Sequence, residues 1–185
     1  MNRLFVEKLA EFNAEARELL HDLRTNLSLD TLTGVRVIQR YDVDGLSEGD
    51  FATASTLILA EPQVDAVTSE LALEADEQAF AVEFLPGQFD QRADSAAQCV
   101  QILTGEQRPL IASAHVIVLR GALASGDLSR VKDYVINKVD SREASLDVPD
   151  SLAQPVNEPA PVASLTGFQE MDEAGLINLR GELGL

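Results

Sequence analysis

Hydrophobic and polar positions along the first 145 residues predict an alternation of strands and helices. Apolar residues spaced three and four apart mark one face of a helix, and short β-branched or aromatic runs mark strands. In the first half we expect the order β-α-β-α-β at 3–9, 14–27, 34–43, 47–60 and 64–70. In the second half we expect the same order at 79–85, 93–104, 111–120, 126–136 and 138–145.

The two halves also resemble each other residue by residue. The segment 4–7 (LFVE) recurs as 80–83 (FAVE), a displacement of 76 residues (80 − 4), and 35–40 recurs at 115–120, a displacement of 80. In the first helices the apolar face Ala16, Leu19, Leu20 and Leu23 is matched by Ala96, Cys99, Val100 and Leu103. Several matches in the same order indicate an internal duplication.

The predicted fold is therefore an α+β domain over 1–145, made of two pseudo-two-fold-related β-α-β-α-β units. Unit one spans 1–70 and unit two spans 79–145, with an acidic connector between them. A unit of about 75 residues buries little surface on its own. We expect the small sheets of the two units to pack together, which relieves that shortage.

The chain changes character after residue 145. Four prolines within thirteen residues exclude a helix and favour an extended linker over 146–165; they are Pro149, Pro155, Pro159 and Pro161. The segment 166–185 is expected to form a short helix, which its glycines weaken. The abrupt end at Gly184-Leu185 suggests a truncated chain.

Composition narrows the classes of partner and compartment. The chain has 14 Lys plus Arg against 31 Asp plus Glu, a formal net charge of -17. Such a charge opposes binding to phosphate backbones and to anionic membranes. One cysteine forms no internal disulfide, and no run approaches the ~18 apolar residues of a membrane span. We expect a cytoplasmic protein without a nucleic-acid or membrane partner.

No complete catalytic or metal site emerges from the residues. Cys99 is expected to be a buried structural thiol on the apolar face of its helix, without a neighbouring base. His21 and His115 lie in different units and lack further ligands at zinc spacing. Glu7 and Glu83 occupy matching strand positions, which favours a structural role over acid/base chemistry.

One segment, 84–99, carries more polar chemistry than its counterpart in the first half. It runs FLPGQFDQRADSAAQC from a strand through a Pro-Gly turn to a helix start, whereas the counterpart loop at 10–13 is shorter. A helix N-terminus offers free amide donors to an anion or polar ligand. Arg92 adds a guanidinium capable of a two-pronged contact.

The same segment also carries a family resemblance. Together with GVRVIQRYDVDGL at 34–46 and YVINKVDSREASL at 134–146, it resembles the N-terminal region of phosphoribosylformylglycinamidine synthase, in the long single-chain form of firmicutes and related bacteria. The resemblance covers essentially the whole chain but only the leading part of that enzyme. In the family this region is similar to a fused dimer of a separate small subunit.

The resemblance implies a part of an ATP- and glutamine-dependent ligase of purine biosynthesis, with ATP and magnesium bound outside this chain. The segment itself would bind no cofactor or metal, would hold no catalytic residue and would be inactive alone. It would be a scaffold for the synthetase and glutaminase domains, near the substrate or ammonia path. The expected substrate-facing or interdomain residues are Gln88, Asp90, Gln91, Arg92, Asp94 and Ser95. Of these, Arg92 would contact an anion and Asp94 would cap the helix or bind a neighbouring domain.

A second hypothesis comes from a different functional class. The chain would be a free-standing tandem regulatory module that binds a small effector between its two sheets. Such a site favours Gly-rich loops in both units, and only Pro86-Gly87 fits.

Overall fold

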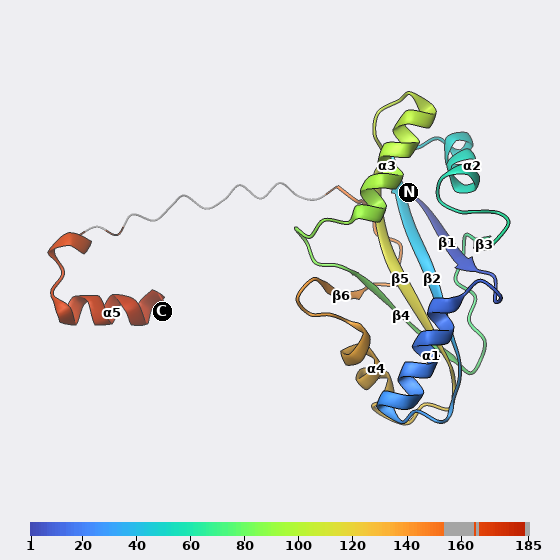
Figure 1. Cartoon of the computed structure of the whole chain (residues 1–185). Coiled ribbons are helices and arrows are strands. Elements are labelled where there is room, and N and C mark those ends of the chain that lie inside the picture. The colour runs from blue at the N-terminus through green and yellow to red at the C-terminus, as the bar shows by residue number, and fades with distance from the viewer. Residues whose placement is uncertain (154–164, 166, 184–185) are drawn as a thin grey trace. The chain divides into compact units, whose positions relative to one another are not determined.

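The computed structural model describes residues 1–153, 165 and 167–183, and the chain divides into two compact units, 1–153 and 154–185. The first unit follows the predicted order of elements closely (Figure 1). Its elements are β1 (Asn2–Lys8), α1 (Ala14–Leu27), β2 (Leu32–Asp44), α2 (Glu48–Leu57), β3 (Asp65–Thr68), β4 (Glu77–Phe84), α3 (Gln91–Thr104), β5 (Leu110–Gly121), α4 (Asp127–Val135) and β6 (Ser141–Ala144).

All six strands form one antiparallel sheet in the order β3-β1-β2-β5-β4-β6. The long strands β2 and β5 pair along their whole length, from Leu32 opposite Gly121 to Asp44 opposite Leu110. The α+β class is confirmed, but the expectation of two small sheets packed together is wrong. The strands of the two halves join edge to edge, which buries the edges that two separate sheets would expose.

All four helices of this unit pack on one face of the sheet. Because side chains alternate along a strand, Val37, Tyr41 and Val43 of β2 point to the same face. Val37 packs in a cluster with residues of α1 and α4, and Tyr41 and Val43 pack in a cluster with residues of α2 and α3. Each half thus contributes one helix to each cluster, α1 beside α4 and α2 beside α3.

The second face of the sheet is held by buried charges as well as by apolar contacts. Phe5, Ile38, Val116 and Val118 form its apolar centre. Beside them, the Asp42 carboxylate binds two arginines, with Arg3 Nε at 2.5 Å and Arg40 Nε at 3.2 Å. Burial lowers the pKa of the Arg40 guanidinium, although the Asp42 charge opposes this shift.

These arginines also fasten the chain that crosses the second face. Arg3 donates hydrogen bonds to the carbonyls of Leu146 and Asp147, and Arg40 donates one to Ser145. Arg36 donates to the carbonyl of Ala72 in the connector between the halves. The second face is therefore covered by two crossing segments, whereas the helix face remains partly open.

Helix α3 corrects the prediction for Cys99. The residues of α3 that are buried against the sheet are Ala93, Ala96, Ala97 and Val100. Cys99 is exposed, and Leu103 is 42% exposed. The matching face was displaced by three residues in the sequence comparison, almost one helical turn, so it still caught Ala96 and Val100 but replaced the other two members.

The second unit is described by itself. It contains a short 3-10 turn, Phe168–Glu170, and helix α5, Glu173–Leu183. The Asp172 carboxylate accepts a hydrogen bond from the backbone N–H of Gly175. This helix lies inside the segment predicted to be helical, while Pro155, Pro159 and Pro161 of the predicted linker lie outside the described residues.

Candidate functional site

A groove of about 1000 Å³ lies on the helix face of the sheet, with α1 and α3 as its walls. Figure 1 shows the two helices lying across the strands with an uncovered stretch of sheet between them. The last turn of α4 and the loop after it, through Ser141, close one end. A concave site of this size on a formed scaffold is the natural place to look for binding.

The α1 wall is anchored from below and acidic above. Asn13 caps the helix by accepting a hydrogen bond from the N–H of Ala16, and Leu23 is fully buried. With that face fixed against the sheet, the groove-facing side presents Glu15, Glu18 and Asp22, all exposed. These three carboxylates stand three and four residues apart and so lie in one row.

The α3 wall begins at a residue that joins loop, helix and sheet. Asp90 caps α3 by accepting from the N–H of Ala93 at 2.9 Å. Its other carboxylate oxygen accepts from the N–H and the hydroxyl of Ser113 on β5, at 3.1 and 2.9 Å. Because one carboxylate fixes all three partners, the start of α3 is held firmly against the sheet.

The groove-facing residues of α3 are small except for one arginine. Arg92 Nη1 donates a long hydrogen bond of 3.4 Å to the buried Tyr41 hydroxyl. Beyond it the wall continues with Ser95, Ala96 and Cys99. The α3 wall is therefore low and nearly uncharged past its first turn.

The floor is formed by β2 and β5 and contains one titratable ring. Tyr41, Ser113, His115 and Ile117 line it. Burial lowers the pKa of the His115 imidazole; Glu15 opposes this and Arg92 adds to it, while Asp90 raises it slightly. His115 Nδ1 lies 3.8 Å from a Glu15 carboxylate oxygen, so no close ion pair ties the α1 row to the floor.

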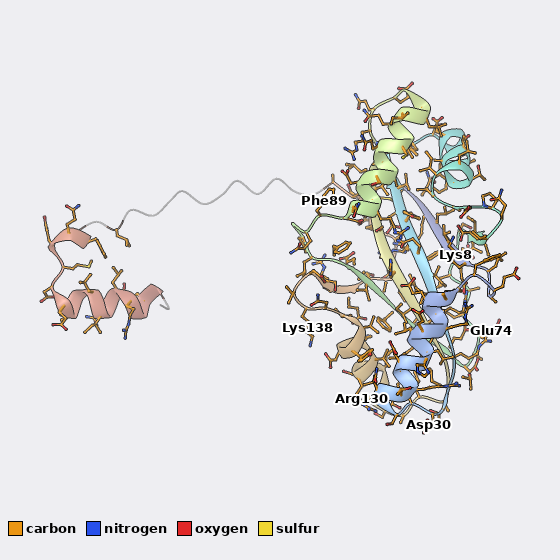
Figure 2. All side chains as sticks on the ribbon, viewed as in Figure 1. Lys8, Asp30, Glu74, Phe89, Arg130 and Lys138 are labelled. Carbon is orange, nitrogen blue, oxygen red and sulfur yellow. The ribbon has the colours of Figure 1, made fainter. Side chains whose placement is uncertain are left out.

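Exposed apolar side chains gather near the closed end of the groove. Phe84 and Tyr134 line it and are 45% and 43% exposed. Phe89 and Val139, in the adjoining loops, are 70% and 80% exposed. Figure 2 shows Phe89, before α3, on the same side of the unit as Lys138, after α4. This end offers apolar surface to a partner.

The structure separates the six residues expected at the site into two groups. Gln91, Arg92 and Ser95 line the groove. Asp90 and Asp94 are used within the fold, since Asp90 caps α3 and Asp94 pairs with Arg108 at 2.6 Å. The cap is thus Asp90, and the assignment of Asp94 to that role was wrong. Gln88 is exposed in the turn before the helix, where its N–H donates to Leu85.

The acidic row of α1 was missed in the sequence. Its signal was available, because Glu15, Glu18 and Asp22 follow the helical spacing on the polar side of a well-predicted helix. Their importance comes from α3 facing them across the groove, and no local pattern reports that pairing.

The other titratable residues have structural partners. Glu7 accepts paired hydrogen bonds from Arg36, which raise the pKa of that guanidinium, and Glu83 binds Arg142 at 2.7 Å. Across residues 1–153, 165 and 167–183, no three His, Cys, Asp or Glu side chains gather as a metal-binding group. Among the helices of those same residues, none is both long and apolar enough to span a membrane.

Comparison with known proteins adds no assignment. No protein-family model matches this sequence, and no curated protein matches it either.

Proposed function

We propose that this chain is a non-catalytic scaffold region of a glutamine-dependent synthase of the phosphoribosylformylglycinamidine synthase type. In such an enzyme, ATP, magnesium and glutamine are bound by synthetase and glutaminase domains, and the cytoplasmic reaction serves purine biosynthesis. The chain would hold those domains together beside the substrate or ammonia path. On its own it would hydrolyse neither glutamine nor ATP.

The observation that carries the proposal is the exposure of the segment on which the resemblance rests. Residues 84–99 have polar side chains that a fold alone does not need, and Gln91, Arg92 and Ser95 line an open groove. Asp90 meanwhile fixes the segment to β5. A firmly held surface with free polar groups is suited to contact a neighbouring domain.

A duplicated origin, part of the same proposal, is supported by the strand registers. Phe5 of β1 pairs with Arg40, and Ala81 of β4 pairs with Val116, so both partners are displaced by 76 residues (81 − 5 and 116 − 40). The outer strands follow suit, with Thr68 opposite Phe5 and Ala144 opposite Ala81. A single displacement for three strands is what a pseudo-two-fold axis would produce.

The position of that axis follows from the central pair of strands. Gln39 pairs with His115, and these two residues are themselves 76 apart (115 − 39). The helix caps Asn13 and Asp90 are 77 apart (90 − 13). The axis would therefore pass through the floor of the groove, and the displacement of 80 inferred for these strands and helices gives way to 76 or 77.

The alternative of a small-molecule sensor loses its original site. An effector between two sheets has no place in a unit with one sheet. The groove has the volume of a small-ligand site, and this keeps the alternative testable by thermal shift. Stabilisation by an amino acid or a nucleotide would favour the sensor over the scaffold.

Reconstitution tests the proposal. The 185-residue chain is mixed with a synthetase–glutaminase region of this enzyme type, and binding and glutamine-dependent turnover are measured. We expect complex formation and higher turnover, both reduced by Arg92→Ala and retained with Arg130→Ala, an arginine outside the groove. Absence of binding, or activity of the chain alone, would reject the scaffold.

A further inference from the structure

The row of carboxylates on α1 lacks close neutralising partners. Within residues 1–153, neither Glu18 nor Asp22 forms an ion pair, and the nearest cation to Glu15 is His115 at 3.8 Å. Burial disfavours the charged form of that imidazole. The wall thus keeps most of its negative charge, in a chain whose formal net charge is already -17.

The opposite wall leaves room for a bulky occupant. At the positions that face Glu18 and Asp22 in the proposed duplication, 77 residues later, α3 has Ser95 and Cys99. Short side chains on one wall and long acidic ones on the other make an asymmetric groove. A partner lying in it would meet charge on one side only.

The bottom and closed end of the groove are apolar. Aliphatic side chains of Ile58, Val82 and Val135 line it together with Ile117, and the half-exposed rings of Phe84 and Tyr134 stand at the end. An apolar floor beside a charged wall matches the two faces of an amphipathic helix, which is a common ligand of such grooves.

We propose that the groove binds an amphipathic helix of a partner protein, with lysines or arginines against Glu15, Glu18 and Asp22 and apolar residues on the floor. The acidic row runs over seven residues of α1, about 10 Å along the axis. Basic residues at the same spacing on a second helix would face all three carboxylates. A second copy of this chain would instead add its own negative charge, so a basic partner is favoured.

This inference goes beyond the proposed function, because it defines the chemistry of a partner whatever enzyme supplies it. It can fail while reconstitution succeeds through another surface, and it can hold when reconstitution fails. The two experiments therefore give separate answers.

The test uses the full 185-residue chain and a synthetic 18-residue Leu/Lys amphipathic peptide. Binding is measured by calorimetry and by the rate at which Cys99, the one cysteine of the chain, reacts with a thiol reagent. Cys99 lines the groove, so an occupant should slow its reaction. A Leu/Glu peptide of the same length is the control ligand.

Matched charge variants locate the contact. The triple variant Glu15→Gln, Glu18→Gln, Asp22→Asn should weaken Leu/Lys binding by about tenfold, as expected for three exposed ion pairs. The control triple variant Asp30→Asn, Glu48→Gln, Glu106→Gln removes the same charge from exposed positions outside the groove and should change affinity little. Ser95→Trp should block binding sterically without altering charge.

Four results would overturn the proposal. They are equal weakening by both triple variants, equal binding of the Leu/Glu peptide, binding that leaves the Cys99 rate unchanged, and a dimer of the free chain that already protects Cys99. The last result would assign the groove to a second copy.

Discussion

Helices α1 and α3 are built alike but present different chemistry to the groove between them. Each has 14 residues, an Asn or Asp cap whose side chain accepts a backbone hydrogen bond, and a left-handed residue at its C-terminal end. Against the sheet, Leu23 of α1 and Val100 of α3 are both fully buried. Toward the groove, three carboxylates on α1 face Ser95 and Cys99 on α3.

The difference teaches which positions the fold constrains. Caps and sheet-facing residues keep their physical character in both helices because the fold needs them. The groove-facing positions share none of that burden, so their chemistry differs freely. If the halves arose by duplication, the groove walls are where function has been added to a common frame.

The largest expected effect comes from the buried anchors that the two helices share. Leu23→Ala should lower the free energy of unfolding by about 3 kcal/mol, because both the transfer energy and a cavity are involved. Val100→Ala should cost less, since fewer methyl groups are lost. Urea unfolding measures both, with Ile102→Ala, 75% exposed on α3, as a control that should stay within about 0.5 kcal/mol.

The caps should separate the two helices. Asp90→Ala removes the α3 cap and both hydrogen bonds from Ser113, and should cost about 2–3 kcal/mol. Asn13→Ala removes only the bond from Ala16 and should cost about 1 kcal/mol. Equal losses in chemical unfolding would show that the link from Asp90 to β5 contributes nothing.

The C-terminal ends allow a reciprocal exchange. Ser28 has φ 54° and Gly105 has φ 69°, both in the left-handed region. Gly105→Ser should destabilise by about 1 kcal/mol, although its side chain would meet no neighbour within 4 Å. Ser28→Gly should change stability by at most about 0.5 kcal/mol, since relief of strain is offset by a more flexible unfolded chain. Thermal unfolding of both variants checks the opposite trends.

The smallest expected effect concerns pH. Burial lowers the pKa of His115 in the folded chain, so protonation favours unfolding. Its contribution is complete above about pH 6.5, the ordinary value for histidine, and is lost as the pH falls through the lowered pKa. The effect is small because the side chain is 45% exposed. His115→Gln should flatten the decline of Tm between pH 7.5 and 5, whereas His21→Gln should leave it unchanged.

Local signals predicted the elements well. Helix α1 begins and ends where expected, because Asn13 caps it and its apolar spacing is regular. Ser47 accepts from the N–H of Asp50, as its spacing from that residue indicated. Helix α3 begins two residues before the prediction, since the cap is Asp90.

Long-range features were not accessible in the same way. Edge-to-edge joining of β2 and β5 depends on which strands meet, and an apolar run looks alike in one sheet or two. The sharing of Asp42 by Arg3 and Arg40 brings distant positions together. For the site, Arg92 and Ser95 were identified from their loop, but the facing row on α1 depends on the fold.

The most direct test of the account is the reaction rate of Cys99 in complex with the synthetase–glutaminase region. Cys99 stands in the groove and is the chain's one thiol, so it reports occupancy of that surface alone. We predict that saturating amounts of the region slow its alkylation, and that Ser95→Trp weakens the complex. A complex that forms while Cys99 reacts at its free rate would contradict the assignment of the groove as the docking surface.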